Sequence, residues 1–269
     1  MWLRHLWTVV MVAVAPGAGA AEIASHRAAY DLALTSDLDG VRGGTGRIVA
    51  ELRQTSCGTF ETDYRFVARF EREDASVVTD QRTRNVESIP DRTLDFRTEA
   101  FVDGQPESLI EGKATTGDTS TRVELQSPEP RSLEIALSVF PIAHLEDLID
   151  KAVAGETMVE TTFFDGDNEA DKRLTTTAVI APLSPAGFAG KKEEGTADER
   201  RPALDGLRAW RVHESYYNSD NEADGLPLYQ ATYDLYENGV SDNFVLDNGD
   251  YAFSGGLVSL DLLDGPPCD

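Results

Sequence analysis

The chain has 269 residues, 41% of them hydrophobic and 27% charged, which suffices for one large domain or two small ones with an apolar core. Its 24 lysines and arginines stand against 48 aspartates and glutamates, a net charge of −24 at pH 7. A surface of that sign repels nucleic acid and anionic lipid headgroups, which excludes a nucleic-acid-binding role. It would attract basic partners or cations, although solubility in a salty medium is the simpler reason for the charge.

Residues 1–20 have the pattern of a secretory signal peptide. Arg4 supplies a positive start, an apolar run follows over residues 6–15, and Ala18-Gly19-Ala20 forms an A-x-A cleavage site. A membrane anchor is the alternative, but this run is too short to span a bilayer and nothing prolongs it. No cysteine stands at the cleavage site, which argues against a lipoprotein, and no later stretch is apolar enough to span a membrane. We therefore expect the mature chain in the periplasm or outside the cell.

Cys57 and Cys268 are the two cysteines of the chain. In an exported protein such a pair suggests one disulfide, with two free buried thiols as the alternative. The bond would close a loop of about 210 residues and tie the first expected hairpin to the end of the chain.

Alternating apolar and polar residues predict strands from the start of the mature chain, at 28–34, 48–52 and 60–70. In the clearest run Phe60, Tyr64 and Phe66 share one face and charged side chains fill most of the other, which predicts a strand with one buried face. The glycines within 37–46 predict a loose turn between the first two strands rather than a nucleotide-binding loop.

Further strands are expected at 77–87, 94–102, 107–113 and 121–126. Asp103-Gly104 between two of them is a turn signal. Because no helical segment intervenes to carry the chain across a sheet, these strands predict an antiparallel meander.

One amphipathic helix is expected at 141–154. Pro141 suits a first helical position and Gly155 a stop, while residues 133–140 fit either a buried strand or a first helical turn. A single helix in a β-rich chain must bury its stripe, so we expect it to plug an opening or to cross a sheet face. The apolar stripe consists of Ile142, Leu145, Ile149 and Ala152 or Val153.

The second half of the chain returns to strand patterns, at 156–164, 174–180, 210–217, 229–236, 240–246 and 251–263. Residues 181–204, rich in proline, glycine and charge, are expected to form a mobile loop. The strand pattern is the same on both sides, which indicates an insertion rather than a domain linker. Residues 21–269 are therefore expected to form a single domain.

No set of residues in this chain specifies a reaction. It has no G-x-S-x-G, H-E-x-x-H or Cys-x-x-Cys motif and no phosphate-binding glycine loop. His26, His144 and His213 are far apart and lack ligand spacing, and His144 is expected at the helix flank. Its many acids guarantee neighbouring carboxylates but locate no glycosidase-like pair. We predict a protein that is not an enzyme and that holds no cofactor.

Two acidic turns, at 165–169 and 220–224, have a composition that calcium would accept. The first lacks the mid-loop glycine and the bidentate glutamate of an EF-hand. Solvated hairpin tips are the expectation for both, so no metal site is predicted.

Six stretches, spread in order over almost the whole mature chain, carry a family resemblance. They are SHRAAYDL at 25–32, GRIVAEL at 46–52 with the following Cys57, FPIAHLEDLIDKAVAGET at 140–157, FFDG at 163–166, LYENGVSDNFVLDNGDYAFSG at 235–255, and the final LLD with Cys268. On these stretches the chain resembles the EipB-type cell-envelope integrity proteins of alphaproteobacteria. Residues 191–201 lie outside the resemblance.

The resemblance implies a periplasmic antiparallel sheet wound into a spiral and partly closed like a barrel, with the helix against its opening. That shape is similar to the lipoprotein carriers of the LolA and LolB type. It also implies a disulfide between Cys57 and Cys268, support of envelope integrity with a periplasmic tetratricopeptide-repeat partner, and no catalytic or cofactor residues.

Three functions are therefore weighed. The leading hypothesis is a non-enzymatic periplasmic protein that maintains the cell envelope through protein partners. The second is a carrier or sensor of a lipid or a lipoprotein acyl chain, because one-sided apolar strands with a plugging helix can enclose an apolar cavity. The third, a hydrolase of envelope polymers, is motivated by abundant carboxylates alone.

Overall fold

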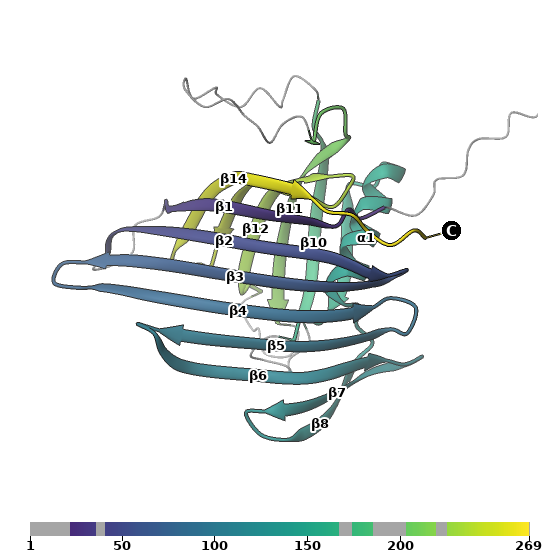
Figure 1. Ribbon diagram of the computed structural model, residues 1–269, viewed down its shortest axis with the longest axis horizontal. Helices are drawn as coiled ribbons and strands as arrows, with labels where there is room; N and C mark the ends of the chain where they lie inside the picture. Colours follow the sequence, from purple (N-terminus) through teal and green to yellow (C-terminus); the bar gives the residue numbers. More distant parts are fainter. Residues whose placement is uncertain (1–21, 36–40, 167–173, 185–202, 219–224, 269) are drawn as a thin grey trace, which may run out of the picture.

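A computed structural model of the chain describes residues 22–35, 41–166, 174–184, 203–218 and 225–268. The expected signal peptide and residues 185–202 of the expected insertion loop lie outside them. Within the described residues the chain forms one antiparallel sheet of 14 strands and a single helix (Figure 1). The expectation of a mainly β, antiparallel fold is confirmed.

The strands are β1 (His26–Leu34), β2 (Val41–Ser56), β3 (Thr59–Arg72), β4 (Ser76–Ser88), β5 (Thr93–Val102), β6 (Gln105–Thr116), β7 (Ser120–Ser127), β8 (Arg131–Ala136), β9 (Met158–Phe163), β10 (Leu174–Pro182), β11 (Ala209–Asn218), β12 (Tyr229–Tyr236), β13 (Ser241–Asp247) and β14 (Ala252–Leu262). The helix, α1 (Pro141–Ala154), follows β8 in the chain.

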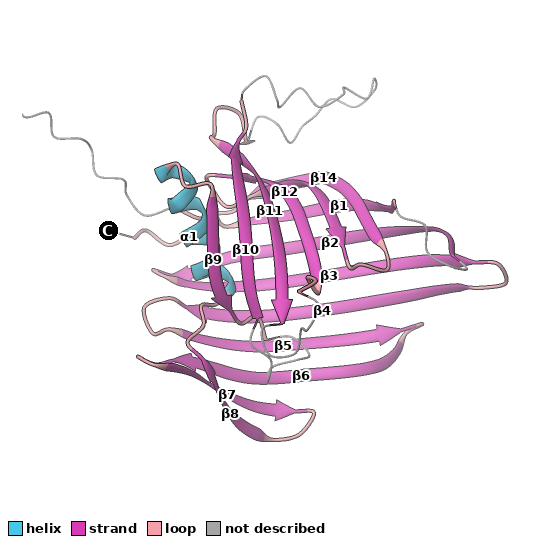
Figure 2. Ribbon diagram, turned by 180° about the vertical axis from the view of Figure 1, so that it is seen from behind, coloured by secondary structure: helices cyan, strands magenta, loops and turns pink. Residues whose placement is uncertain are grey.

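The sheet follows the chain in two runs. Strands β1 to β8 lie side by side in sequence order, strands β9 to β14 do the same, and the two runs meet where β1 pairs with β14. Figures 1 and 2 show the runs facing each other in a nearly closed barrel, with α1 at one end. Among the described residues no helix combines the length and the apolar character needed to cross a membrane.

Pairing of the first strand with the last closes the sheet on one side. The ladder begins with His26 opposite Leu262 and runs the length of β1. The backbones approach so closely that a Cβ on Gly255 would lie 1.9 Å from the carbonyl oxygen of Asp31. Only a residue without a side chain fits there, so the sequence of β14 is adapted to this closure.

On the other side, the edges β8 and β9 are joined by the segment that links β8 to α1. The Val139 N–H donates to the Thr162 carbonyl oxygen, and the Phe164 N–H donates to the Val139 carbonyl oxygen, both at 3.0 Å. This isolated parallel bridge nearly completes the barrel. Residues 133–140 are expected to be either a buried strand or a first helical turn. In the structure β8 ends at Ala136 and the helix begins only at Pro141.

Side chains on the inner face fill the barrel in three apolar clusters. The cluster around α1 joins Leu52 and Phe60 of the first run to Val212 and Leu235 of the second. A second cluster contains Tyr30, Leu32, Ile48 and Phe253, and a third contains Leu94, Phe96, Phe140 and Phe164. The inner face of the sheet is therefore core, as the alternation along β3 predicts.

Residues 41–46 of the glycine-rich stretch form part of a strand, not the expected loose turn, while residues 37–40 lie outside the described residues. Strand β2 already begins at Val41 and includes Gly43, Gly44 and Gly46. A Cβ on Gly46 would lie 3.1 Å from the ring of Phe66, and one on Gly44 would lie 3.1 Å from the Arg69 carbonyl oxygen. These glycines therefore make room for close packing inside a strand, a use that the turn rule does not consider.

Helix α1 has the expected bounds. Gly155 ends it in a left-handed conformation with φ of 86°. Leu148 and Ile149 are each 1% exposed, and burying two such side chains contributes roughly 1.5–3 kcal/mol apiece to folding. Leu148 and His144 belong to the buried face, which the expected stripe omits.

Cys57 and Cys268 form a disulfide across 211 positions of sequence. Cys57 follows β2 and Cys268 follows β14, so the bond fastens the far end of the chain to the first run of strands. Both residues are exposed, so the bond is accessible to reductant and contributes little packing.

We predict that the double variant Cys57→Ser/Cys268→Ser folds to the same sheet but is less stable. A loop of this size contributes up to about 5 kcal/mol by restricting the unfolded chain. Guanidinium denaturation of both proteins should give a free energy of unfolding lower by about 2–5 kcal/mol for the variant. Equal midpoints and slopes for the two proteins would show that the bond does not restrict the unfolded chain.

Candidate functional site

The helix is held at its N-terminus by a carboxylate from the sheet. Glu87, at the end of β4, is 2% exposed. Its two carboxylate oxygens accept hydrogen bonds from the backbone N–H groups of Ile142 and Ala143, with N···O distances of 2.8 and 2.9 Å. The N-cap residue Phe140 has no side chain that could do this. Glu87 therefore satisfies amides that the helix leaves unpaired and, in its ionised form, places a negative charge at the positive end of the helix dipole.

The buried environment of Glu87 raises the pKa of its carboxyl group. Burial, with a smaller contribution from the nearby Glu146 carboxylate, raises the pKa of Glu87 to about 7. The two amide hydrogen bonds and the charge of His144 act in the opposite direction but are outweighed. The residue therefore changes charge near neutral pH rather than in acid.

A second buried contact holds the same turn of α1 to the second run of strands. The His144 imidazole Nε2 lies 2.8 Å from Glu214 Oε1, and both side chains are nearly inaccessible, at 6% and 3% exposure. The hydroxyls of Tyr216 and Tyr233 donate to Glu214 Oε2 at 3.1 and 2.7 Å. His144 is thus buried, and the expectation that it lies at the helix flank is wrong.

The charge of Glu214 follows from its partners. Burial alone would raise the pKa of Glu214, but the hydrogen bond and charge of His144, together with the two tyrosine hydroxyls, hold it below its usual value. Glu214 is therefore an ionised acceptor inside the barrel.

Glu87, His144 and Glu214 form a unit that we call the helix clasp. It fixes the first turn of α1 between β4 and β11, on opposite runs of the sheet. A glutamate–histidine pair is also a common acid–base arrangement. Here both side chains are enclosed, so the clasp positions the helix rather than a substrate.

The remaining residues considered from the sequence do not converge. His26 Nδ1 donates to the Ala24 carbonyl oxygen, and His213 Nδ1 lies 2.8 Å from the Thr232 hydroxyl on β12. Within the described residues no group of three or more histidine, cysteine or acidic side chains is arranged to hold a metal ion. Residues 167–169 and 220–224 of the acidic turns lie outside the described part of the chain.

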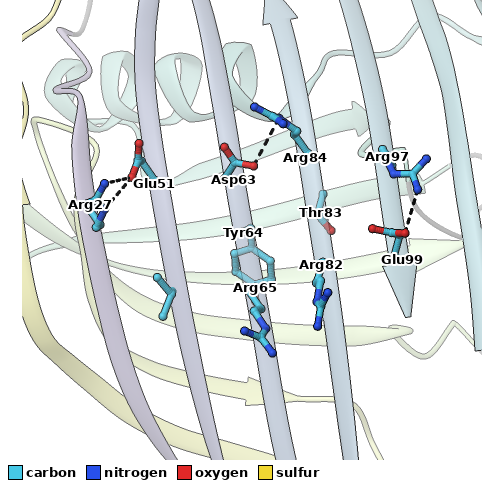
Figure 3. Close-up of a pocket in the computed structure, with 11 residues that line it drawn as sticks. Arg27, Glu51, Asp63, Tyr64, Arg65, Arg82, Thr83, Arg84, Arg97 and Glu99 are labelled. Carbon is cyan, nitrogen blue, oxygen red and sulfur yellow. Dashed lines mark hydrogen bonds and ion pairs between the residues drawn. The ribbon is translucent and has the colours of Figure 1, made fainter. Parts of the chain in front are cut away.

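The outer face of β1–β5 carries a groove of about 550 Å³ (Figure 3). We call it the arginine groove. Its basic side chains are Arg27, Arg65, Arg82, Arg84 and Arg97. Its acidic side chains are Glu51, Asp63 and Glu99. In a chain of net charge −24, a lining with five arginines and three carboxylates departs from the overall excess of acids.

The pairing of strands explains why these side chains meet. Arg27 lies opposite Glu51, Glu51 opposite Asp63, Asp63 opposite Arg84, and Arg84 opposite Arg97, in one row across five strands. Side chains at such positions share a face of the sheet. The sequence shows outward arginines in several strands, but only the register shows that they form one surface.

The carboxylates of the groove are engaged by arginines. Arg27 contacts Glu51 at 2.5 Å and Arg97 contacts Glu99 at 2.9 Å, while Arg84 reaches Asp63 at 3.5 Å (Figure 3). A hydrolase of the glycosidase type needs one carboxyl group to hold a proton and a second to act as nucleophile or base. Hydrogen bonds from Arg53 and Arg27 hold the pKa of Glu51 below its usual value, so this carboxyl group is unsuited to the protonated role.

The clasp yields a prediction for Glu87→Gln. The folded protein binds the Glu87 proton more tightly than the unfolded chain does, so this group stabilises the fold below the ordinary pKa of 4.5 and ceases to do so as the pH rises to about 7. Relative to the variant, the wild type should therefore lose about 3 kcal/mol of unfolding free energy over this interval.

Urea denaturation from pH 4.5 to pH 7.5 measures this difference. Glu124→Gln, an exposed residue of β7, is the matched control and should follow the wild type. A constant difference between wild type and Glu87→Gln at every pH would contradict the assignment.

Comparisons with known proteins agree with this geometry. The family model described as EipB-like matches residues 17–264. Cell envelope integrity protein EipB of Brucella abortus (strain 2308) is 32% identical over 256 residues, which cover 93% of this chain and 88% of that protein. A crystal structure of a beta-barrel-like protein of a domain of unknown function, also from Brucella abortus, superposes with a TM-score of 0.80 at 32% identity, covering 91% of this chain and all of that one. The chain described here is a member of the EipB-like family.

Proposed function

We propose that this protein is an exported, non-enzymatic factor that maintains the integrity of the cell envelope by binding other proteins in the periplasm. The observation that carries the proposal is the match over 93% of the chain to a relative named for cell envelope integrity. A disulfide between exposed cysteines fits an oxidising compartment such as the periplasm.

The arrangement of polar groups supports a binding role over a catalytic one. The glutamate–histidine pair is enclosed and serves the helix, while the accessible charges line a sheet face. A broad sheet face with mixed charges suits recognition of a partner through complementary charges. The tetratricopeptide-repeat partner expected from the family resemblance belongs to this proposal.

A carrier of lipid or of a lipoprotein acyl chain is the second candidate. It is favoured by one observation: the helix that closes one end of the barrel is held there by the clasp, and Glu87 has a pKa of about 7. In the cluster around α1, side chains of the helix pack against both runs of strands. A carrier would therefore have to move α1 out of this cluster to admit an acyl chain.

We predict that deletion of the gene sensitises its host to detergent and to chelators of divalent cations. Expression of the full chain should restore growth, whereas a chain without residues 1–20 should not, because it stays in the cytoplasm. Crosslinking in living cells, followed by purification of the tagged chain, should recover the same periplasmic protein in every repeat.

The outcomes separate the candidates. The proposed role would be overturned if the deletion strain grew like the wild type in detergent and chelator. It would also be overturned if the chain without residues 1–20 restored growth. Native mass spectrometry that finds a bound lipid and no protein would favour the carrier.

A further inference from the structure

Two pairs of arginines stand directly opposite each other in the arginine groove. Arg65 on β3 pairs with Arg82 on β4, and Arg84 on β4 pairs with Arg97 on β5. The two pairs are neighbours, because Arg82 and Arg84 are two positions apart on one strand and share its outer face. Like charges directly opposite each other in an antiparallel pair destabilise a sheet. A block of four arginines is therefore a cost to stability that calls for a reason.

Neighbouring carboxylates offset this repulsion unevenly. Asp80 accepts hydrogen bonds from Arg65 Nε and Nη2, both at 2.8 Å, and from Arg82 Nη2 and Nε at 2.7 and 3.2 Å. Hydrogen bonds from Arg65, reinforced by Arg82, lower the pKa of Asp80 to about 2. One carboxylate thus serves both members of the first pair, and at neutral pH it is fully ionised.

The second pair is asymmetric. Arg97 contacts both Glu99 and Glu111. Among the described residues, the one ion pair of Arg84 is the long contact of 3.5 Å to Asp63, and 64% of its side chain is exposed. A guanidinium group carries five N–H donors in a planar fork. Arg84 is therefore a largely exposed guanidinium group with one long ion pair, in a groove that four further arginines also line.

A ligand that binds here must compete with carboxylates that the protein already supplies. A single carboxylate would add nothing that Asp80 or Glu99 lacks. A phosphate monoester carries between one and two negative charges at neutral pH and three strong acceptor oxygens. A phosphodiester carries one charge and two free oxygens, and either group can bridge two guanidinium groups. The acids of the groove and the overall charge of −24 repel an extended polyanion. A compact ligand with a single phosphate group meets less of this repulsion.

We propose that the arginine groove is a binding site for a phosphate-bearing ligand of headgroup size, with Arg84 as its principal donor and Arg65, Arg82 and Arg97 around it. The volume of about 550 Å³ is that of a site for a small molecule. Two sources supply this chemistry, a soluble phosphate ester and the phosphate of a lipid headgroup. The inference stands apart from the proposed function, since a phosphate site requires no protein partner.

The test uses the purified mature chain and inorganic pyrophosphate as the probe. Isothermal titration at low salt should show binding by the wild type that weakens as salt is added. Arg84→Gln should reduce the affinity tenfold or more. The matched control is Arg69→Gln, which removes an exposed arginine from the outer face of β3 at a position outside the groove. It should bind as the wild type does. Arg84 is largely exposed, so thermal melting should show that both variants fold normally.

Vesicles distinguish the two sources. Co-sedimentation with phosphatidylglycerol vesicles but not phosphatidylcholine vesicles, lost in Arg84→Gln, would identify a lipid headgroup. Binding of pyrophosphate without vesicle binding would identify a soluble phosphate ester. Equal affinity of the wild type, Arg84→Gln and Arg69→Gln for pyrophosphate, or no binding to either probe, would overturn the proposal.

Discussion

The ladder between β1 and β14 brings His26 opposite Leu262 and makes one surface out of two runs of strands. Each run alone would be an open sheet with one apolar face exposed to water, which a domain of this kind cannot tolerate. Pairing of the first and last strands turns the two apolar faces toward each other and removes two of the four free edges. The apolar clusters inside the barrel and the position of α1 both depend on the pairing of β1 with β14.

Strand β4 illustrates how closely the inner and outer surfaces depend on one register. Glu87 points inward and holds the helix, whereas Arg82 and Arg84 point outward into the groove. The side-chain period of a strand is two residues, so a slip by one position would exchange the two sets. It would bury arginines and expose the cap of α1. The clasp and the arginine groove are thus two consequences of the same pairing of β3, β4 and β5.

Much of the fold follows from local patterns in the sequence. The period of two along β3 and the stripe of α1 depend only on neighbouring residues, so these elements lie where they are expected. The glycines after Val41 mislead because a turn and a close-packed strand use the same residue for different reasons. His144 misleads because its burial depends on a glutamate 70 positions away. The four opposing arginines could not be predicted for the same reason, because their pairing depends on the register between strands and not on the sequence of any single strand.

Native-state amide hydrogen exchange on the oxidised protein tests the closure most directly. If the β1–β14 ladder ties the barrel together, the amides of β1 should exchange only through global unfolding, with the same free energy as those of β3 and β4. The amides of β8, the last strand at one end of the strand order, should exchange sooner. Exchange of β1 and β14 by local opening, while β3 to β6 stay protected, would contradict the account, because the barrel would then hold together without its closing pair.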